Sequence, residues 1–357
     1  MRWDGQSVRS GEDGALPGLA LSGLLRSVRT PDFAGVTFHE VAAKSALNKV
    51  PDASSMPFRW TVNPMRGCVH ACAYCYARPT HEYLELDAGR DFETQIVVKT
   101  NVVEVLRAEL ARPSWRREHV ALGTNTDPYQ RPEGRYRLMP GIIEALAASG
   151  TPFSILTKGP LLRRDLPALV DAARRVPVGV AVSLAMLDPE LQQSVEPGTP
   201  LPRARLDLIR AVRDAGLPCG VFVAPVMPWL TDSEEHLDAL LAALADAGAS
   251  GVTVLPMHLR GSVKPWFLRW LAQEHPELAP RYRRLYGRGA YVPVEYKSWL
   301  WARVRPLLEA HGFDKRAERQ AEGAQRRPEE GAYPLGSIPE PADGGGAGFD
   351  VDQPVLF

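Results

Sequence analysis

The chain has 357 residues, of which 45% are hydrophobic and 24% charged, and its 42 basic residues balance 42 acidic ones. This composition is typical of a globular protein and excludes a fibrous or largely disordered one. The zero net charge gives by itself no indication of a nucleic-acid partner. No apolar run reaches membrane-spanning length and no signal peptide follows Met1, so we expect no membrane contact and a cytoplasmic location with reduced cysteines.

Residues 1–40 are polar and Gly-rich apart from a short apolar patch at 19–25, and residues 1–56 are predicted to form a peripheral N-terminal arm and lead-in. From residue 57 onward, short apolar runs alternate with amphipathic stretches. The runs at 59–62, 119–123, 153–157, 178–183, 219–223 and 251–255 are predicted strands, and the stretches at 101–112, 141–148, 161–174, 203–215 and 233–247 are predicted helices. Apolar strands that do not alternate are typical of a parallel sheet whose outer face is covered.

Six strand–helix units over residues 57–258 predict parallel strands joined by right-handed crossovers. The pattern permits either an open doubly wound sheet or a barrel. In both folds the reactive groups lie at the carboxyl ends of the strands.

The alternation stops after residue 258. The stretches 265–274, 278–286 and 294–311 are predicted helices of an extension that covers 259–318, and 319–357 is predicted to be a disordered tail rich in Gly, Pro, Glu and Ala. Residues 257–327 carry 15 Lys and Arg against 7 Asp and Glu. The tryptophans of this segment recur at helical spacing, which is more typical of a core than of a base-stacking surface.

Three of the four cysteines, Cys68, Cys72 and Cys75, fall within eight residues. Thiolates at this spacing can face one centre from a single loop, and three of them suit an iron–sulfur cluster with one iron left open. A structural zinc site would need a fourth ligand from His70, His81 or Cys219, and a zinc- or cluster-stabilised binding module without catalytic activity is the corresponding alternative. The six strand–helix units favour an enzyme.

The cysteine spacing resembles the cluster motif of the radical S-adenosylmethionine (radical SAM) superfamily. Its flanking residues are similar to the subgroup that contains spore photoproduct lyase: Asn63, Pro64, Arg66, Gly67, His70, Tyr74, Tyr76, Ala77 and Arg78. The resemblance implies a partial (β/α)6 barrel, a [4Fe–4S] cluster bound by the three cysteines, and reductive cleavage of SAM to a 5′-deoxyadenosyl radical. It also implies a one-electron reductant such as flavodoxin or ferredoxin as a partner.

The resemblance implies SAM contacts as well. Tyr74 matches an aromatic position that lies against the adenine, and Thr126 and Asp127 match the end of a Thr-Ser-Asp element that contacts SAM. Lys158 matches a lysine that binds the SAM carboxylate, and Ser183 a serine whose hydroxyl faces SAM. The alternatives are a strand-to-loop turn at Asp127-Pro128 and a packed serine inside the barrel. For Glu196, Arg203 and Arg205, which follow the fourth strand, the sequence does not distinguish a ribose contact from helix-capping roles.

One position departs from the lyase. Its hydrogen-donating cysteine is replaced here by Thr124, whose O–H bond is too strong to give a hydrogen atom readily to a carbon radical. Cys219 begins the fifth strand, six residues or roughly 20 Å from the reactive face, and is expected to be a buried structural thiol. Tyr74, Tyr76 and Tyr129 are chemically possible donors.

The last residues, Gln353, Pro354, Val355, Leu356 and Phe357, resemble the pentapeptide that bacterial replication and repair proteins insert into the sliding clamp, although Leu is usual where Pro354 stands. With the basic extension and the lyase-like cluster loop, this terminus favours a radical SAM enzyme that acts on DNA lesions or modified nucleic acid. The alternative is a radical SAM enzyme that modifies RNA, protein or a metabolite.

Overall fold

A computed structural model describes residues 23–51, 54 and 56–313. Its larger sheet has the order β11-β10-β9-β8-β7-β4-β3. The strands are β3 (Leu47–Lys49), β4 (Trp60–Val62), β7 (Val120–Leu122), β8 (Phe153–Thr157), β9 (Val178–Ser183), β10 (Cys219–Val226) and β11 (Gly251–Pro256). All neighbours from β4 to β11 are parallel, and β3 is antiparallel to β4. In the described part of the chain β3 and β11 do not pair, so the six parallel strands form an open, partial barrel as predicted.

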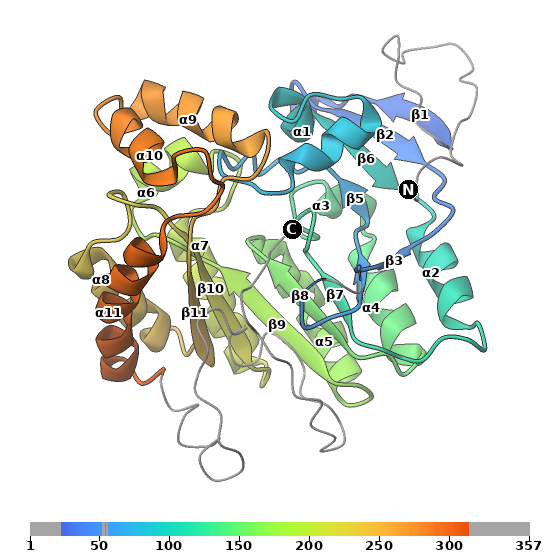
Figure 1. The fold of residues 1–357 in the computed structure, drawn as a ribbon. Coiled ribbons are helices and arrows are strands. Elements are labelled where there is room, and N and C mark those ends of the chain that lie inside the picture. The colour runs from blue at the N-terminus through green and yellow to red at the C-terminus, as the bar shows by residue number, and fades with distance from the viewer. Residues whose placement is uncertain (1–22, 52–53, 55, 314–357) are drawn as a thin grey trace.

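Helices cover one face of this sheet (Figure 1). They are α2 (Val102–Leu110), α4 (Met139–Ala148), α5 (Leu166–Ala173), α7 (Pro202–Asp214) and α8 (Glu234–Asp246). Each predicted helix of the barrel overlaps one of them. The segment predicted at 161–174 is divided between the 3-10 helix η3 (Pro160–Asp165) and α5.

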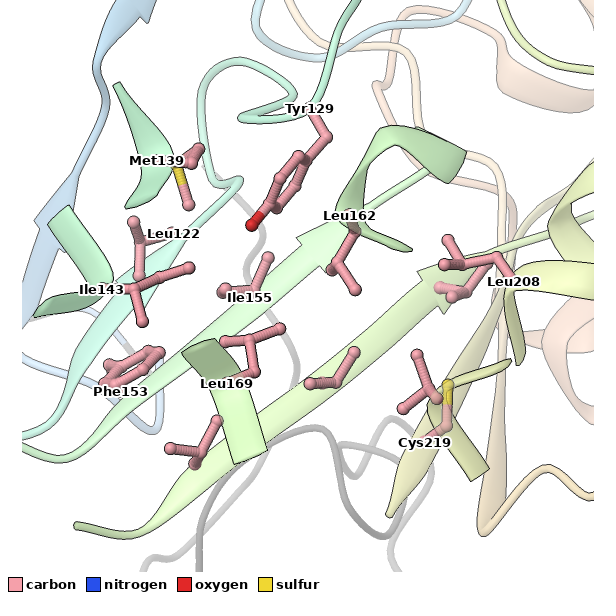
Figure 2. Packing of buried hydrophobic residues seen from close by; sticks show 14 of the residues in the cluster. Leu122, Tyr129, Met139, Ile143, Phe153, Ile155, Leu162, Leu169, Leu208 and Cys219 are labelled. Carbon is pink, nitrogen blue, oxygen red and sulfur yellow. The ribbon is translucent and has the colours of Figure 1, made fainter. Parts of the chain in front are cut away.

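Alternate residues along each strand face opposite sides of the sheet. Val178, Val180 and Val182 of β9 pack under the helices, whereas Ala181 faces the inner side together with Phe222 and Leu255. Figure 2 shows the helix-covered layer, with Phe153 and Ile155 of β8 beside Leu169 and with Cys219 at the start of β10. Cys219 is therefore a buried core thiol at the amino end of its strand, as predicted.

The same alternation places the predicted site residues on the inner side. Ser183 ends β9 in step with Ala181. Lys158 follows β8 in step with Leu156, which packs against the inner cluster around Phe222. Both residues thus lie at the carboxyl ends of their strands, facing away from the helix-covered core.

A second sheet corrects the prediction of a peripheral N-terminal arm. It has the order β1-β2-β6-β5, formed by β1 (Leu24–Val28), β2 (Thr37–Val41), β6 (Gln95–Lys99) and β5 (Met65–Arg66). All five residues of β2 are buried. Residues 24–41 are thus a structural layer beside the barrel, and β5 places this layer directly before the cysteine loop. The part of the predicted arm before residue 23 lies outside the described residues.

The predicted extension contains α9 (Val263–Glu274), α10 (Ala279–Tyr286) and α11 (Val294–Ala310). In Figure 1, α9 and α10 lie near α6 (Pro189–Val195), and α11 packs against α8 and β11. The helices α9 and α10 share a hydrophobic cluster with Cys72, Ala73 and Tyr74. Residues 314–318 of the extension and the predicted tail 319–357, with its terminal peptide, lie outside the described residues.

Within the described residues, no helix is both long and apolar enough to cross a membrane.

Candidate active site

The three cysteines lie on one loop that follows β5. Successive backbone turns shape it: Ala71 N donates to Cys68 O at 3.3 Å, Cys75 N to Cys72 O at 3.2 Å, and Arg78 N to Cys75 O at 3.3 Å. Cys68 and Cys72 are buried, Cys75 is half-buried, and all three are free thiols. The loop therefore presents three thiols from consecutive turns, as the cysteine spacing predicted.

The pKa shifts of the thiols show that the three cysteines are close enough to influence one another. Burial raises the pKa of Cys68, and Asp127, Cys72 and Cys75 raise it further. Burial raises the pKa of Cys72 to about 12, with Glu196 and Cys75 adding to the shift. A metal centre reverses this preference, because a coordinating thiol is deprotonated. Three free thiols on one loop, two of them buried, thus fit the thiolate ligands of an iron–sulfur cluster.

The residues that a zinc site would need as a fourth ligand have other surroundings. His70 Nδ1 lies 3.4 Å from an Asp127 carboxylate oxygen, and His81 Nε2 lies 2.9 Å from Gln95 O. Cys219 lies in the core at the amino end of β10. Among the residues that the structure describes, no three His, Cys, Asp or Glu side chains converge tightly enough for a single metal ion. The thiolates of a cubane cluster bind three different irons and need no such convergence.

Arg78 holds the loop in shape from inside the protein. Its side chain is fully buried and donates to Cys72 O and Ala71 O, both at 3.0 Å, and to Gly89 O at 2.6 Å. It also pairs with Glu93 at 2.7 Å, and the guanidinium lies 4.7 Å from the Trp266 ring of α9. Arg78 thereby fixes two carbonyls of the loop and connects the loop to the extension.

The segment after α6 supports the opposite side of the loop. Ala73 N donates to Val195 O at 2.9 Å, and Gly198 N donates to His70 O at 3.1 Å. A Cβ at Gly198 would overlap the Val69 carbonyl oxygen, so this close backbone approach requires glycine. The cysteine loop is thus held between α6, Gly198 and Arg78.

Thr126 lies at the carboxyl end of β7 and contacts the start of the loop. Its hydroxyl donates to Gly67 O at 2.6 Å and accepts from Gln130 Nε2 at 2.8 Å. Gln130, which is fully buried, also accepts from Val69 N at 2.9 Å. The two side chains join the end of β7 to the cysteine loop. The SAM contact of Thr126 stays a prediction.

Asp127 connects three neighbouring segments. Its carboxylate accepts from Thr157 Oγ1 at 2.5 Å, from Lys158 N at 2.7 Å and from Tyr129 N at 2.9 Å. Together with the His70 contact, this leaves the carboxylate well supplied with donors. In this structure Asp127 holds the end of β8, and with it Lys158, next to the cysteine loop. Its predicted contact to SAM stays a prediction.

A buried charge network lies behind the loop. The Tyr74 hydroxyl donates to Glu196, and Arg205 donates to the other oxygen of the same carboxylate. Burial raises the pKa of Glu196, but the cations Arg205 and Lys158 outweigh it and bring the pKa to about 2. Glu196 is therefore an anion at neutral pH and sets the position of the Tyr74 ring.

Lys158 lies between this network and the cysteines. Its Nζ is 3.9 Å from Glu196 and 5.7 Å from the centre of the Tyr74 ring. Burial lowers the pKa of Lys158, but Cys72 and Glu196 raise it more strongly, so that the lysine stays protonated. Two cations, Lys158 and Arg205, thus share one carboxylate. The surplus positive charge suits the carboxylate of an amino-acid ligand.

Ser183 lies nearby on β9, and its hydroxyl donates to Ala224 O at 3.4 Å. Arg205 Nη1 donates to Ser183 O at 3.2 Å. Ser183 is therefore joined through its backbone to the network around Glu196. The predicted contact between its hydroxyl and SAM stays a prediction.

The three tyrosines that could chemically donate a hydrogen atom have different surroundings. The Tyr76 hydroxyl donates to Thr124 O, at the position where the lyase has its cysteine. The Tyr74 hydroxyl is bound to Glu196. Tyr129 points into the helix-covered core, where its hydroxyl lies 3.1 Å from Asp165 (Figure 2). Of the three, Tyr76 follows Cys75 in the chain and contacts Thr124.

Sequence patterns left three contributors without an assigned role: Arg78, Gln130 and Glu196. Arg78 and Glu196 are long polar side chains that the fold buries completely. The available signals were the position of Arg78 just after the third cysteine and that of Glu196 after the fourth strand. Their partners are distant in sequence, so spacing alone could not assign them.

The family model of the radical SAM superfamily matches residues 62–241. An uncharacterised protein of Mycobacterium tuberculosis is 67% identical over 312 residues, which cover 86% of this chain and 92% of that protein. An uncharacterised protein of Acidianus two-tailed virus is 30% identical over 210 residues, which cover 57% of this chain and 68% of that protein.

Among solved structures, a mutant spore photoproduct lyase with bound AdoMet and dinucleoside spore photoproduct superposes with a TM-score of 0.58 and 17% sequence identity. The match covers 77% of this chain and 79% of the lyase. At this identity the likeness shows a shared fold. The family match spans the cysteine loop, the carboxyl ends of β7, β8 and β9, and the network around Glu196. The chain belongs to the radical SAM superfamily.

Proposed function

We propose that this protein cleaves SAM reductively at a [4Fe–4S] cluster bound by Cys68, Cys72 and Cys75 and directs the resulting radical to a base in DNA. The observation that carries the first half is the arrangement of three free thiols on one loop, two of them buried, beside Lys158 and Tyr74 and at the carboxyl ends of parallel strands. Reactive groups of α/β barrels gather at this end. Superfamily membership implies the same pair of cofactors.

The reduced cluster, when bound, supplies an open iron for SAM and the electron that cleaves SAM to methionine and a 5′-deoxyadenosyl radical. The protein's own residues position SAM. Lys158, whose ammonium lies 3.9 Å from Glu196, would pair with its carboxylate, and the Tyr74 ring, held by Glu196, would lie against its adenine. The half-buried loop excludes water from one side of the site, which strengthens these charge interactions.

The proposal of a DNA substrate has three supports. The lyase with the same fold was solved with a dinucleoside photoproduct. The described extension, residues 257–313, carries 10 Lys and Arg against 4 Asp and Glu. The terminal residues Gln353 to Phe357 resemble a clamp-binding peptide, which would bring the enzyme to replicating DNA. A cytoplasmic location and a flavodoxin- or ferredoxin-type reductant belong to the same proposal.

The hydrogen-return step must differ from that of the lyase. Thr124 offers no thiol, and Cys219 lies in the core at the other end of the strands. Tyr76 is the nearest phenol to Thr124, and a phenolic O–H bond is weaker than that of an alcohol. We therefore propose that Tyr76 gives its phenolic hydrogen atom to the base radical, and that the resulting tyrosyl radical is returned to tyrosine by one proton and by one electron from the flavodoxin- or ferredoxin-type reductant.

The test is anaerobic turnover of the reconstituted enzyme with dithionite and SAM. Ultraviolet-irradiated DNA should increase the formation of 5′-deoxyadenosine above that with undamaged DNA, RNA or no substrate. Cys72→Ala, which lacks a cluster ligand, should form none. Stimulation by RNA and not by DNA would favour the RNA-modifying alternative, and cleavage of SAM that no nucleic acid stimulates would contradict a DNA substrate.

A further inference from the structure

A row of three aromatic rings leads from the cysteine loop to the protein surface. Tyr76 follows the ligand Cys75, His258 lies two residues after β11, and Tyr291 lies between α10 and α11. The ring centres of Tyr76 and His258 are 6.1 Å apart, and those of His258 and Tyr291 are 5.8 Å apart. Tyr291 is 40% exposed. The proposed SAM cleavage does not use this row.

His258, at the centre of the row, has an unmet hydrogen-bonding atom. Its Nδ1 is buried and has no partner in the described structure. Burial, with Arg260 nearby, lowers the pKa of His258 to about 4, so the imidazole is neutral at physiological pH. A buried polar atom without a partner costs free energy. The Nδ1 atoms of His81 and His119 are also without a partner, but of these three histidines His258 is the one that lies in the row of rings. A bound molecule can supply the missing partner.

The row is held rigidly by the extension. Tyr282 and Tyr286 of α10 donate to Pro228 O at 2.6 Å and to Met257 O at 2.7 Å, fixing the segments after β10 and β11. Leu259 N donates to Ala290 O at 2.7 Å, which joins the His258 segment to the Tyr291 segment. These hydrogen bonds tie the segments that carry His258 and Tyr291 to α10 and to each other.

Two cations lie at the outer end of the row. The Arg260 guanidinium is 5.1 Å and the Lys297 ammonium 5.8 Å from the centre of the Tyr291 ring. Aromatic faces bordered by Arg and Lys are the usual means of binding an unstacked nucleotide, because the rings stack on the base while the cations attract the phosphate.

We propose that His258 and Tyr291 form the site for the substrate nucleotide. The base stacks on the Tyr291 ring with its edge toward His258 Nδ1, to which it hydrogen-bonds, and its phosphates lie near Arg260 and Lys297. The inference rests on the proposed action on nucleic acid and names the residues that carry it. Because Tyr76 ends the row beside Cys75, a base in this site lies next to the place where the radical is formed.

The test measures binding of a fluorescein-labelled single-stranded oligonucleotide to the reconstituted enzyme with SAM, by anaerobic fluorescence anisotropy. His258→Phe keeps the ring and removes the nitrogens, so affinity should fall roughly fivefold to tenfold, the effect of one hydrogen bond. Tyr291→Ala should weaken binding roughly fivefold to a hundredfold through lost stacking. Tyr291 is partly exposed, so this variant should fold even if His258→Phe does not.

His119→Phe is the matched control. His119 also has a buried Nδ1 without a partner and a pKa lowered to about 4 by burial, but it precedes β7, at the amino ends of the strands. Its replacement should leave oligonucleotide affinity unchanged. Arg260→Gln combined with Lys297→Gln should weaken binding of every sequence and reduce the salt dependence by about one phosphate contact per cation.

The outcomes separate the two proposals. If His258→Phe and Tyr291→Ala both bind the oligonucleotide as tightly as the wild type, this site is overturned, but the proposal of a DNA substrate is not affected. An equal loss in His119→Phe also overturns the site, because the effect would then not depend on the carboxyl end. A wild-type enzyme that cleaves SAM but binds no oligonucleotide overturns both.

Discussion

The Lys158 ammonium lies 3.9 Å from Glu196, which is already paired with Arg205. One carboxylate cannot neutralise two cations, so a positive charge remains that can pair with an anionic ligand. Lys158→Ala should weaken SAM binding roughly tenfold to a hundredfold, the range of a charge-assisted hydrogen bond in a partly desolvated site. Equilibrium dialysis on the reconstituted protein measures it. Lys49→Ala, an exposed change on the edge strand β3, is the control. Unchanged SAM affinity in Lys158→Ala would place Lys158 outside the site.

The cysteines differ in position and therefore in consequence. Replacing Cys68, Cys72 or Cys75 by Ala should abolish the cluster, since all three thiolates come from one loop. Cys219→Ala should keep near-normal iron content, because Cys219 packs in the helix-covered core. Iron and sulfide per chain after anaerobic reconstitution measure both. Loss of iron in Cys219→Ala at unchanged secondary structure would contradict the three-ligand assignment.

The residues of the site were predictable to different degrees. The cysteine triplet was recognisable because its spacing is typical of a cluster loop, and Lys158 because a lysine that ends an apolar strand is rarely a solvated surface charge. Arg78 and Glu196 were not, since burial of a charge depends on partners that only the fold supplies. The hydrogen bonds of Thr126 and Asp127 to the backbone could not be predicted from the sequence either, because they depend on how closely β7 and β8 approach the loop.

At the scale of single elements, the cysteine loop depends on Arg78. Arg78→Ala would remove a donor from Cys72 O, Ala71 O and Gly89 O and the cation from Glu93. Removing one partner of a buried pair costs about 3–5 kcal/mol of unfolding free energy. We expect a clear loss in denaturant unfolding and reduced iron uptake.

Arg175→Ala is the control for this change. Arg175 pairs on the surface with Glu144 and Asp171, where each pair contributes about 0–1 kcal/mol. If Arg78→Ala were as stable as Arg175→Ala and bound iron normally, the loop would be held by its turns and by α6 alone.

The strands of the barrel were predictable and β2 was not, for one physical reason. The barrel strands are continuous apolar runs, such as Val178 to Val182, which the helices cover. The strand β2 buries Thr37, His39 and Glu40, whose polar atoms are satisfied across the sheet by Arg29, by Ser27 and Gln95, and by Arg26. A strand that buries polar side chains together with their hydrogen-bond partners lacks the apolar sequence pattern from which a buried strand is predicted.

At the scale of the whole molecule, buried histidines make stability depend on pH. The pKa of His119 falls from 6.5 to about 4 on folding because of burial. Between these values the unfolded chain binds more protons, so the unfolding free energy decreases as the pH is lowered from 6.5 to 4. His119→Phe should reduce this slope, measured by urea unfolding at a series of pH values. An unchanged slope would mean that His119 is protonated equally in both states.

The terminal peptide gives a second prediction for the whole chain. Leu356 and Phe357 would insert into the clamp's hydrophobic pocket and Gln353 would hydrogen-bond at its rim, with micromolar affinity on the order expected of so short a motif. Deleting residues 353–357 should abolish clamp binding in isothermal titration and leave SAM cleavage intact. The absence of clamp binding by the full chain at tens of micromolar would remove this partner.

Cys72, Ala73 and Tyr74 share a hydrophobic cluster of side chains with Tyr282 and Tyr286 of α10. This packing has a consequence for the order of events during synthesis of the chain. The thiols leave the ribosome more than 200 residues before the tyrosines that cover their loop. At usual rates of translation that interval is roughly 10 to 40 seconds. During it the three thiols are exposed together to oxidants and stray metal ions. We expect the iron–sulfur cluster to be inserted after synthesis of the chain is complete, and α10 to pack against the cysteine loop only then.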